Sequence, residues 1–130
     1  MPHMNMTHDV DPKQTLIDAL GDISEYKVFH NEIVVAVYVR PEKTKSGIYL
    51  PDAHRDEDKI QGKVGLVVKM GPEAFEDPNG NWFKDVSVKL HDWVVFRPSD
   101  GWSQTVNGVL CRALKDTNVR GSIPHPDMVW

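Results

Sequence analysis

Residues 33–39 read IVVAVYV, and this nearly unbroken apolar run decides the fold. β-branched and aromatic side chains favour an extended chain, and a continuous apolar run of this length predicts a strand with both faces covered. We expect the extended segment that contains this run to span Val28 to Val39. A strand covered on both faces belongs inside a barrel or a sandwich, so the stretch predicts an all-β fold.

Further strand patterns follow, separated by turn residues. Residues 62–71 read GKVGLVVKMG, in which the internal Gly65 indicates a bulge or a close approach of another part of the chain. The pair His91-Asp92 predicts a turn in which Asp92 bonds nearby backbone. Short strands with dense turn signals favour a small, partly open β-barrel or a sandwich. The other expected strands are 86–90, 93–96, 102–106 and 109–114, the last two joined at Asn107-Gly108.

The N-terminal region predicts a short helix. Asp11 is placed to cap its start, Pro12 suits its first position, and Gly21 suits its end. A helix of two to three turns is marginal alone, so it must pack on its own domain or on a neighbouring subunit. The apolar side chains that share one face are Leu16, Ile17 and Leu20.

Residues 40–51 read RPEKTKSGIYLP and cannot form one regular element. Pro41 lacks a backbone donor and restricts the residue before it. A polar run then leads to the apolar triplet Ile48-Tyr49-Leu50, and charged residues follow from Asp52 to Lys59. Long loops in small domains are usually functional or disordered, so we interpret this one as an arm with an apolar tip. The alternative is that Ile48 and Leu50 pin the loop to their own domain.

Two further segments lie outside the expected strands. Residues 72–85 form an excursion around the turn pair Asn79-Gly80, and its aromatic side chains predict local packing. These aromatic residues are Phe75, Trp82 and Phe83. Residues 118–130 are Pro-rich and read as irregular, but the apolar chain end 128–130 predicts a docked tail.

Composition narrows the class of protein. The chain has 130 residues, 40% of them hydrophobic and 26% charged, which fits one domain with a modest core. The net charge of −4 gives no basic face for nucleic acid, and no apolar run reaches the length of a membrane span. The first eleven residues lack the pattern of a signal peptide, and the single Cys111 has no disulfide partner, so a reducing cytosol is expected.

A catalytic constellation is not evident. The histidines lack metal-ligand spacing, and Cys111 lies in a strand pattern typical of a buried, inert thiol. The acidic residues 56–58 are interpreted as a solvated charge run. We therefore predict no enzyme activity, no metal site and no cofactor.

The order of these motifs resembles the GroES-type co-chaperonin family. The matching pieces are residues 33–40, the stretch KTKSGIYLP at 43–51, GKV at 62–64 with Val67 and Gly71 downstream, and VKLHDWVVF at 88–96. The resemblance covers roughly Val28 to Leu114. It implies a GroES-like partly open β-barrel that assembles into a seven-membered ring. It also implies that 40–60 corresponds to the family's mobile loop and that 72–85 corresponds to its roof hairpin.

The resemblance also implies a binding site. Ile48, Tyr49 and Leu50 correspond to the residues that contact the chaperonin ring, and Gly47 supplies backbone freedom before them. The expected function is therefore a co-chaperonin that caps a GroEL-like chaperonin ring and assists protein folding in the cytoplasm. The partner is the chaperonin, and the protein itself is expected to form homo-oligomers.

The chain also departs from the family. The expected layout is an N-terminal arm with a helix (1–27), a barrel domain (28–117) and a C-terminal tail (118–130). The arm is longer than the family's, the tail does not follow its usual closing strand, and His91 stands where the family has a turn glycine. Such divergence resembles GroES-like proteins of tailed bacteriophages. The alternative function is thus a virion structural protein, a capsid decoration or cement protein that binds the major capsid protein.

Overall fold

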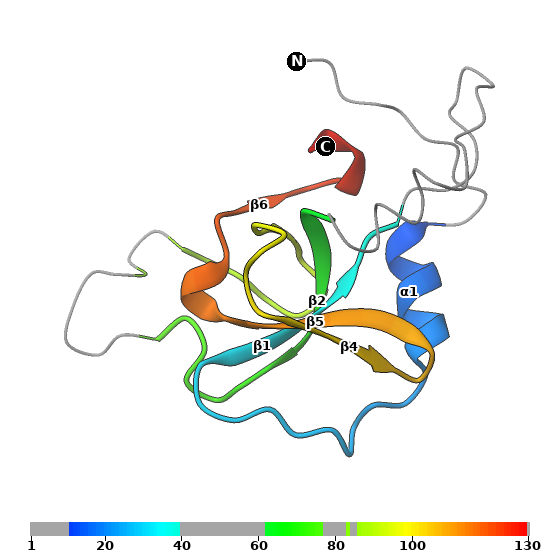
Figure 1. The fold of residues 1–130 in the computed structure, drawn as a ribbon, viewed down its shortest axis with the longest axis horizontal. Helices are drawn as coiled ribbons and strands as arrows, with labels where there is room; N and C mark the ends of the chain where they lie inside the picture. Colours follow the sequence, from blue (N-terminus) through cyan, green and yellow to red (C-terminus); the bar gives the residue numbers. More distant parts are fainter. Residues whose placement is uncertain (1–10, 40–61, 77–82, 84–85, 130) are drawn as a thin grey trace.

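The computed structural model describes residues 11–39, 62–76, 83 and 86–129 (Figure 1). Its strands form one sheet in the order β4-β5-β1-β2-β3-β6, and every neighbouring pair is antiparallel. The elements are α1 (Pro12–Leu20), β1 (Glu32–Val37), β2 (Val64–Met70), β3 (Trp93–Val95), β4 (Trp102–Val106), β5 (Val109–Lys115), the 3₁₀ helix η1 (Asp116–Asn118), β6 (Gly121–Ile123) and the 3₁₀ helix η2 (Pro126–Met128). The prediction of an all-β GroES-like fold with one short N-terminal helix is confirmed, and the sheet is open rather than closed into a barrel.

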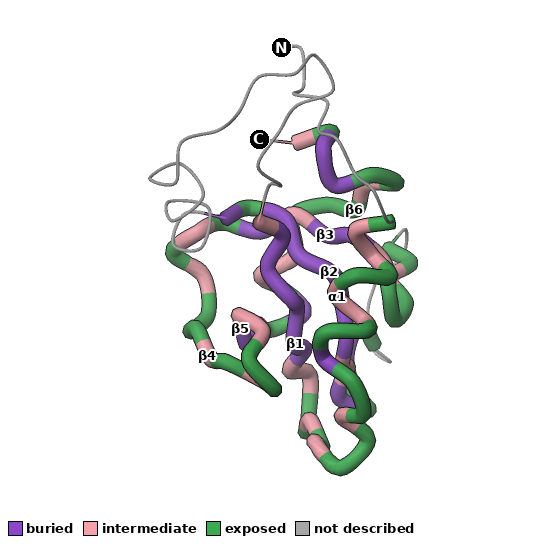
Figure 2. Tube along the Cα trace, turned by 90° about the vertical axis from the view of Figure 1, so that its right-hand side faces the viewer, coloured by how far each residue is buried: buried purple, intermediate pink, exposed green. Residues whose placement is uncertain are grey.

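The central strand β1 is buried on both faces (Figure 2). Its side chains enter two apolar clusters. The helix-side cluster includes Val34, Ala36 and Tyr38, together with Leu66, Val68, Trp93 and Cys111 from other strands. The opposite cluster includes Ile33 and Val35, together with Val67, Val94, Phe96 and Leu114. A strand between two cores needs apolar residues at every position, which explains why IVVAVYV does not alternate.

Local capping explains the bounds of α1. The Asp11 side chain accepts a hydrogen bond from the Lys13 backbone N–H at 3.1 Å, and Pro12 occupies the first turn. At the other end, the Gly21 N–H donates to the Ile17 carbonyl at 3.2 Å while Gly21 takes a φ of 64°. Leu16, Ile17 and Leu20 all pack on the helix-side cluster. Of the two alternatives for the helix, packing on its own domain is therefore the one observed.

β1 is shorter than the expected strand Val28–Val39. It begins at Glu32, because residues 30 and 31 form a turn in which His30 has a φ of 56°, and it ends at Val37.

Two other secondary-structure predictions were wrong. Residues 86–90 are not a strand, because only Val88 packs on the opposite cluster while Val86 and Leu90 are 43% and 52% exposed. An alternating pattern arises equally from an irregular segment pinned by one side chain. In the C-terminal segment, which read as irregular, Gly121–Ile123 forms β6 and pairs with β3, with Trp93 opposite Ile123.

The turn before β3 formed as expected. The Asp92 carboxylate accepts from the Lys89 N–H at 3.0 Å, and the His91 N–H donates to the Val67 carbonyl at 2.7 Å. His91 has a φ of 70°, the left-handed region that glycine adopts without strain. Gly65 also behaves as predicted, since a Cβ there would lie 2.8 Å from a methyl group of Val35.

Replacing His91 with glycine is expected to stabilise the fold, because the left-handed conformation costs a residue that carries a Cβ about 1 kcal/mol. Part of this gain is offset by the greater freedom of glycine in the unfolded chain. The matched control is Leu90→Gly, one residue earlier and also exposed but with no positive φ, which should destabilise. Urea unfolding of the three proteins measures both effects, and a loss of stability in His91→Gly would contradict the strain argument.

A buried carboxylate ties the start of the 72–85 excursion to the sheet. Asp116, only 3% exposed, accepts from the Asn31 side-chain amide and from the Phe75 N–H, each at 3.0 Å. The Phe75 and Phe83 rings meet edge to face with centroids 5.6 Å apart, so the predicted local packing of these two aromatic residues is confirmed. Asn79, Gly80 and Trp82 lie outside the described residues.

Candidate partner-binding site

The predicted contact residues Gly47, Ile48, Tyr49 and Leu50 lie outside the described residues, as does all of 40–61. What the structure describes is the pair of stems where this segment leaves β1 and rejoins β2. The described part of the candidate site is therefore the base of this segment. We use the name loop base for Tyr38, Val39, Gly62 and Lys63.

The two halves of the loop base lie side by side. The Tyr38 N–H donates to the Val64 carbonyl at 2.9 Å, continuing the pairing of β1 with β2 by one residue. The Lys63 carbonyl accepts from the Phe96 N–H at 2.9 Å, which joins the second stem to the end of β3. Residues 40–61 thus connect two adjacent antiparallel strands, and both ends of the connection are fixed to the sheet.

The first stem is held by its side chain as well. Tyr38 is 3% exposed, and its ring meets the Trp93 ring edge to face with centroids 5.7 Å apart. Its hydroxyl donates to the Asp127 carboxylate at 2.5 Å. Both groups are buried, so this hydrogen bond is shielded from water. Tyr38 therefore links the loop base to the C-terminal segment.

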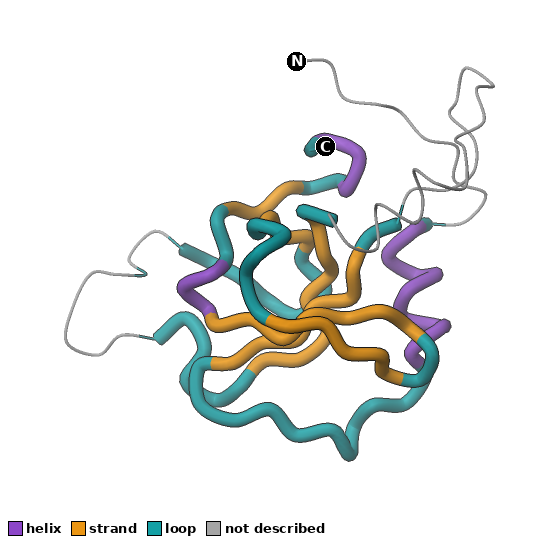
Figure 3. The backbone as a smooth tube through the Cα atoms, in the orientation of Figure 1, coloured by secondary structure: helices purple, strands orange, loops and turns teal. Residues whose placement is uncertain are grey.

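The C-terminal segment is docked, although of the apolar end 128–130 only Val129 is seen to contribute: Met128 is 48% exposed, and Trp130 lies outside the described residues. β6 pairs with β3, Val129 packs on the helix-side cluster, and Pro126 and Asp127 are buried in η2. The His125 ring accepts from the Asp127 N–H at 3.2 Å, which caps the start of η2. Figures 1 and 3 show η2 at the C-terminal end of the chain, above the start of β2 in this view. The hydrogen bond from Tyr38 to Asp127 joins η2 to the residue that follows β1. Sequence reasoning predicted this docking but missed Asp127, because a lone acidic residue in a Pro-rich tail carries no signal of its distant partner.

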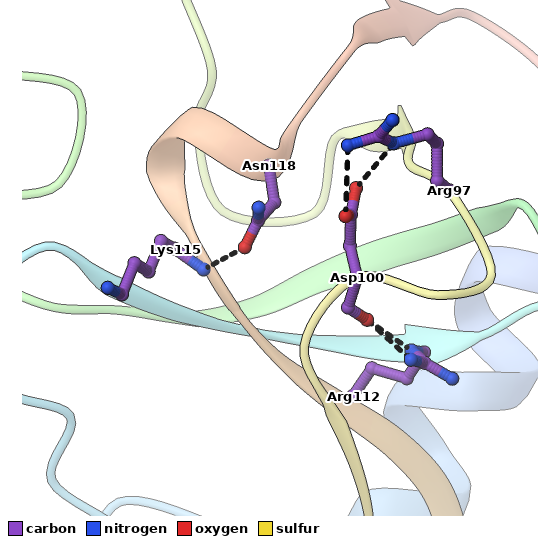
Figure 4. A network of polar contacts seen from close by, with 5 residues as sticks. All are labelled: Arg97, Asp100, Arg112, Lys115 and Asn118. Carbon is purple, nitrogen blue, oxygen red and sulfur yellow. Dashed lines mark hydrogen bonds and ion pairs between the residues drawn. The ribbon is translucent and has the colours of Figure 1, made fainter.

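A second polar network fastens the turn before β4 to β5 (Figure 4). Arg112, 7% exposed, donates twice to the Asp100 carbonyl and once to the Ser103 hydroxyl, and its guanidinium lies 5.9 Å from the centroid of the Phe96 ring. The Asp100 carboxylate pairs with Arg97 at 3.4 Å. These bonds to backbone and neighbouring side chains give the network a structural role.

Among the residues that the structure describes, there is no cluster of three or more side chains suited to bind a metal. In the same residues, no helix is long and apolar enough to cross a membrane. Cys111 is fully buried in β5, as its strand pattern predicted, and burial raises the pKa of its thiol to about 11. At neutral pH the thiol is therefore protonated and shielded, which makes it a poor nucleophile.

The raised pKa of Cys111 predicts a pH-dependent loss of stability. Because the folded protein holds this proton more tightly than the unfolded chain, the contribution is complete below the unfolded value near 9 and is lost as the pH rises towards 11. Cys111→Ala should remove this part of the pH dependence, although it costs stability at neutral pH. Urea unfolding of both proteins between pH 8 and about 11 tests this; parallel curves would contradict it.

Comparison with known proteins adds a second kind of evidence. A family model described as "Chaperonin 10 Kd subunit" matches residues 25–123. A co-chaperonin GroES of Methylorubrum populi is 27% identical over 99 residues, covering 76% of this chain and 97% of that protein. The co-chaperonin GroES of Halothermothrix orenii is 33% identical over 82 residues, covering 63% of this chain and 79% of that protein. The co-chaperonin GroES of Rhodothermus marinus is 29% identical over 97 residues, covering 75% of this chain and 90% of that protein.

The matched region has informative limits. It begins after α1 and ends with β6, so it spans the whole sheet and includes both 40–61 and 72–85. Helix α1 and the segment that carries η2 fall outside it. The similarity to this family therefore lies in the sheet and in the segments between its strands.

Proposed function

Since the chain belongs to the chaperonin 10 Kd subunit family, we propose that it is a co-chaperonin that caps a chaperonin ring and assists protein folding. In this proposal Ile48, Tyr49 and Leu50 dock on the chaperonin, and Gly47 gives the chain the freedom to present them. The protein acts as a homo-oligomeric ring in the cytoplasm. Any ATP hydrolysis belongs to the chaperonin, and no catalytic residue or cofactor is assigned to this chain.

The observation that carries the proposal is the family match running through both fixed stems of the 40–61 segment. A segment with an intact apolar triplet is thereby tethered at two adjacent points of a rigid sheet. Burying such a triplet gains about 5 kcal/mol from apolar area. Ordering the rest of a long connection costs a comparable amount, so one arm alone binds weakly.

A ring turns weak arms into a reversible cap. When several identical arms are held on one body, each later contact is intramolecular and benefits from a high effective concentration. Capping is then strong when all arms engage and is released when the partner withdraws its sites. This explains why a weak, small apolar tip is sufficient for the function.

The alternative role as a capsid decoration protein is not carried into this proposal. The three relatives described above are co-chaperonins, and none is a virion protein. Mass spectrometry of purified phage particles would bring the alternative back if this chain were found in them.

Light scattering with and without a chaperonin tests the proposed function directly. The free protein is expected to have the mass of a ring, and a chaperonin with ATP should produce a larger particle that contains both proteins. A monomer that leaves the chaperonin unchanged under these conditions would contradict the proposal.

A further inference from the structure

We propose that Asp127 is a positioning residue for chaperonin binding: through Tyr38 it holds the point at which the 40–61 segment leaves the sheet. The inference rests on the proposed function, since it concerns the geometry from which the binding arm starts. It assigns a role in partner binding to residues 124–129, which follow the end of the family match.

We call the hydrogen bond between Tyr38 and Asp127 the anchor. It is buried and joins distant parts of the chain. Both side chains are buried, with Tyr38 3% and Asp127 7% exposed, and the hydroxyl lies 2.5 Å from the carboxylate. The two residues are 89 positions apart in sequence, so only the fold brings them together. Holding a carboxylate in such a place is unfavourable unless its hydrogen bonds are satisfied, which makes a chance contact a poor explanation.

The segment that carries Asp127 is itself held in place by other contacts. β6 joins β3 by antiparallel pairing, and β3 carries Trp93, whose ring packs against the Tyr38 ring. Beyond β6, Pro126 is fully buried and Val129 packs on the helix-side cluster. Asp127 is thus presented by a docked segment and restrains a stem residue, although neither residue belongs to the apolar triplet.

The expected effect on binding follows from preorganisation. A stem that is already fixed before docking loses less conformational freedom when the tip binds. Releasing the Tyr38 side chain from Asp127 is expected to weaken each arm by about threefold, and the loss compounds across a multivalent cap to more than about tenfold.

Tyr38→Phe tests the anchor with the smallest change, because it removes only the hydroxyl and keeps the ring against Trp93. The matched control is Tyr26→Phe, which removes a hydroxyl bonded to Gln104 of β4, the strand at the opposite edge of the sheet from β6. Light scattering should give both variants the mass of the wild-type assembly. In calorimetric titration of a chaperonin with ATP, Tyr38→Phe should bind more than about tenfold more weakly, whereas Tyr26→Phe should stay within about twofold. Equal affinity of the two variants would overturn the inference.

Two variants at Asp127 provide an independent test of the same hydrogen bond if Tyr38→Phe does not fold. Asp127→Asn retains an oxygen acceptor for the Tyr38 hydroxyl and should bind close to wild type, whereas Asp127→Leu should reproduce the loss seen in Tyr38→Phe. Equal binding by the Asn and Leu variants would count against positioning through this hydrogen bond.

The wild-type protein separates the two levels of the proposal. If it does not bind the chaperonin, the proposed function fails and the inference fails with it. If it binds and Tyr38→Phe binds as tightly, only the inference fails.

Discussion

Replacing both Ile48 and Leu50 with serine is expected to abolish capping of a chaperonin while leaving the sheet folded. Each substitution exchanges a branched apolar side chain for a small polar one, so most of the area buried by the tip is lost. The loss of about 3 kcal/mol in one arm already exceeds a hundredfold in affinity. In a multivalent cap this loss is repeated in every arm, so no complex should be detected in a pull-down with ATP and a chaperonin.

The control for this variant replaces two apolar side chains of similar size elsewhere on the surface. Val86 and Leu90 are 43% and 52% exposed and lie outside the 40–61 segment. Val86→Ser combined with Leu90→Ser should retain capture. Thermal unfolding of both double variants should stay close to wild type. Normal capture by the Ile48/Leu50 variant would refute the assignment of the tip.

Replacing Gly71 with alanine is expected to destabilise the fold strongly. An added Cβ would overlap the carbonyl oxygens of His30 and Phe29, and these are backbone atoms that no rotamer change can move. The same region is tightly bonded: the Gly71 N–H donates to the Glu32 carbonyl at 2.8 Å, and the Glu73 N–H donates to the His30 carbonyl at 3.0 Å. Relieving the overlap must break part of this pairing, at a cost of about 3 kcal/mol or more.

Gly121 supplies the matched control for this substitution. It has no positive φ, and an added Cβ there would meet nothing within 4 Å. Gly121→Ala should therefore change the free energy of unfolding by no more than about 0.5 kcal/mol. Urea unfolding compares the two variants. A Gly71→Ala protein as stable as Gly121→Ala would show that the segment 29–32 adapts far more easily than its hydrogen bonds indicate.

Features that depend on a few neighbouring residues were predictable from the sequence. The cap at Asp11, the stop at Gly21 and the turn closed by Asp92 each involve contacts within four positions along the chain. The doubly buried strand was equally clear, because IVVAVYV leaves no polar face. At these positions local propensity and local hydrogen bonds favour the same structure, and the tertiary contacts do not oppose it.

Features that depend on distant partners were not predictable. β6 has only three residues, with Gly121 and Ser122 among them, and it is a strand because β3 offers it an edge to pair with. Asp116 and Asp127 look like ordinary surface acids in the sequence, yet both are buried by partners that the chain supplies many residues earlier. Conversely, 86–90 alternates but finds no neighbouring strand. In each case the deciding contact is long-range, and one sequence alone does not encode it in a readable pattern.

The residues of the candidate site also differ in how far the sequence alone identifies them. The binding role of Ile48, Tyr49 and Leu50 could be predicted from the sequence, because these residues are contiguous and stand alone in a polar stretch; it remains a prediction. The hydrogen bond between Tyr38 and Asp127 required the fold, since neither residue type nor spacing identifies it.

The adjacency of β1 and β2 has one more consequence. Neighbouring antiparallel strands need only a two-residue turn to join them, so the sheet makes no demand on the length or content of whatever is inserted at that point. The length or sequence of residues 40–61 could therefore be changed without loss of the pairing between β1 and β2. Such changes would alter the surface that the chain presents to a partner while the stability of the sheet is retained.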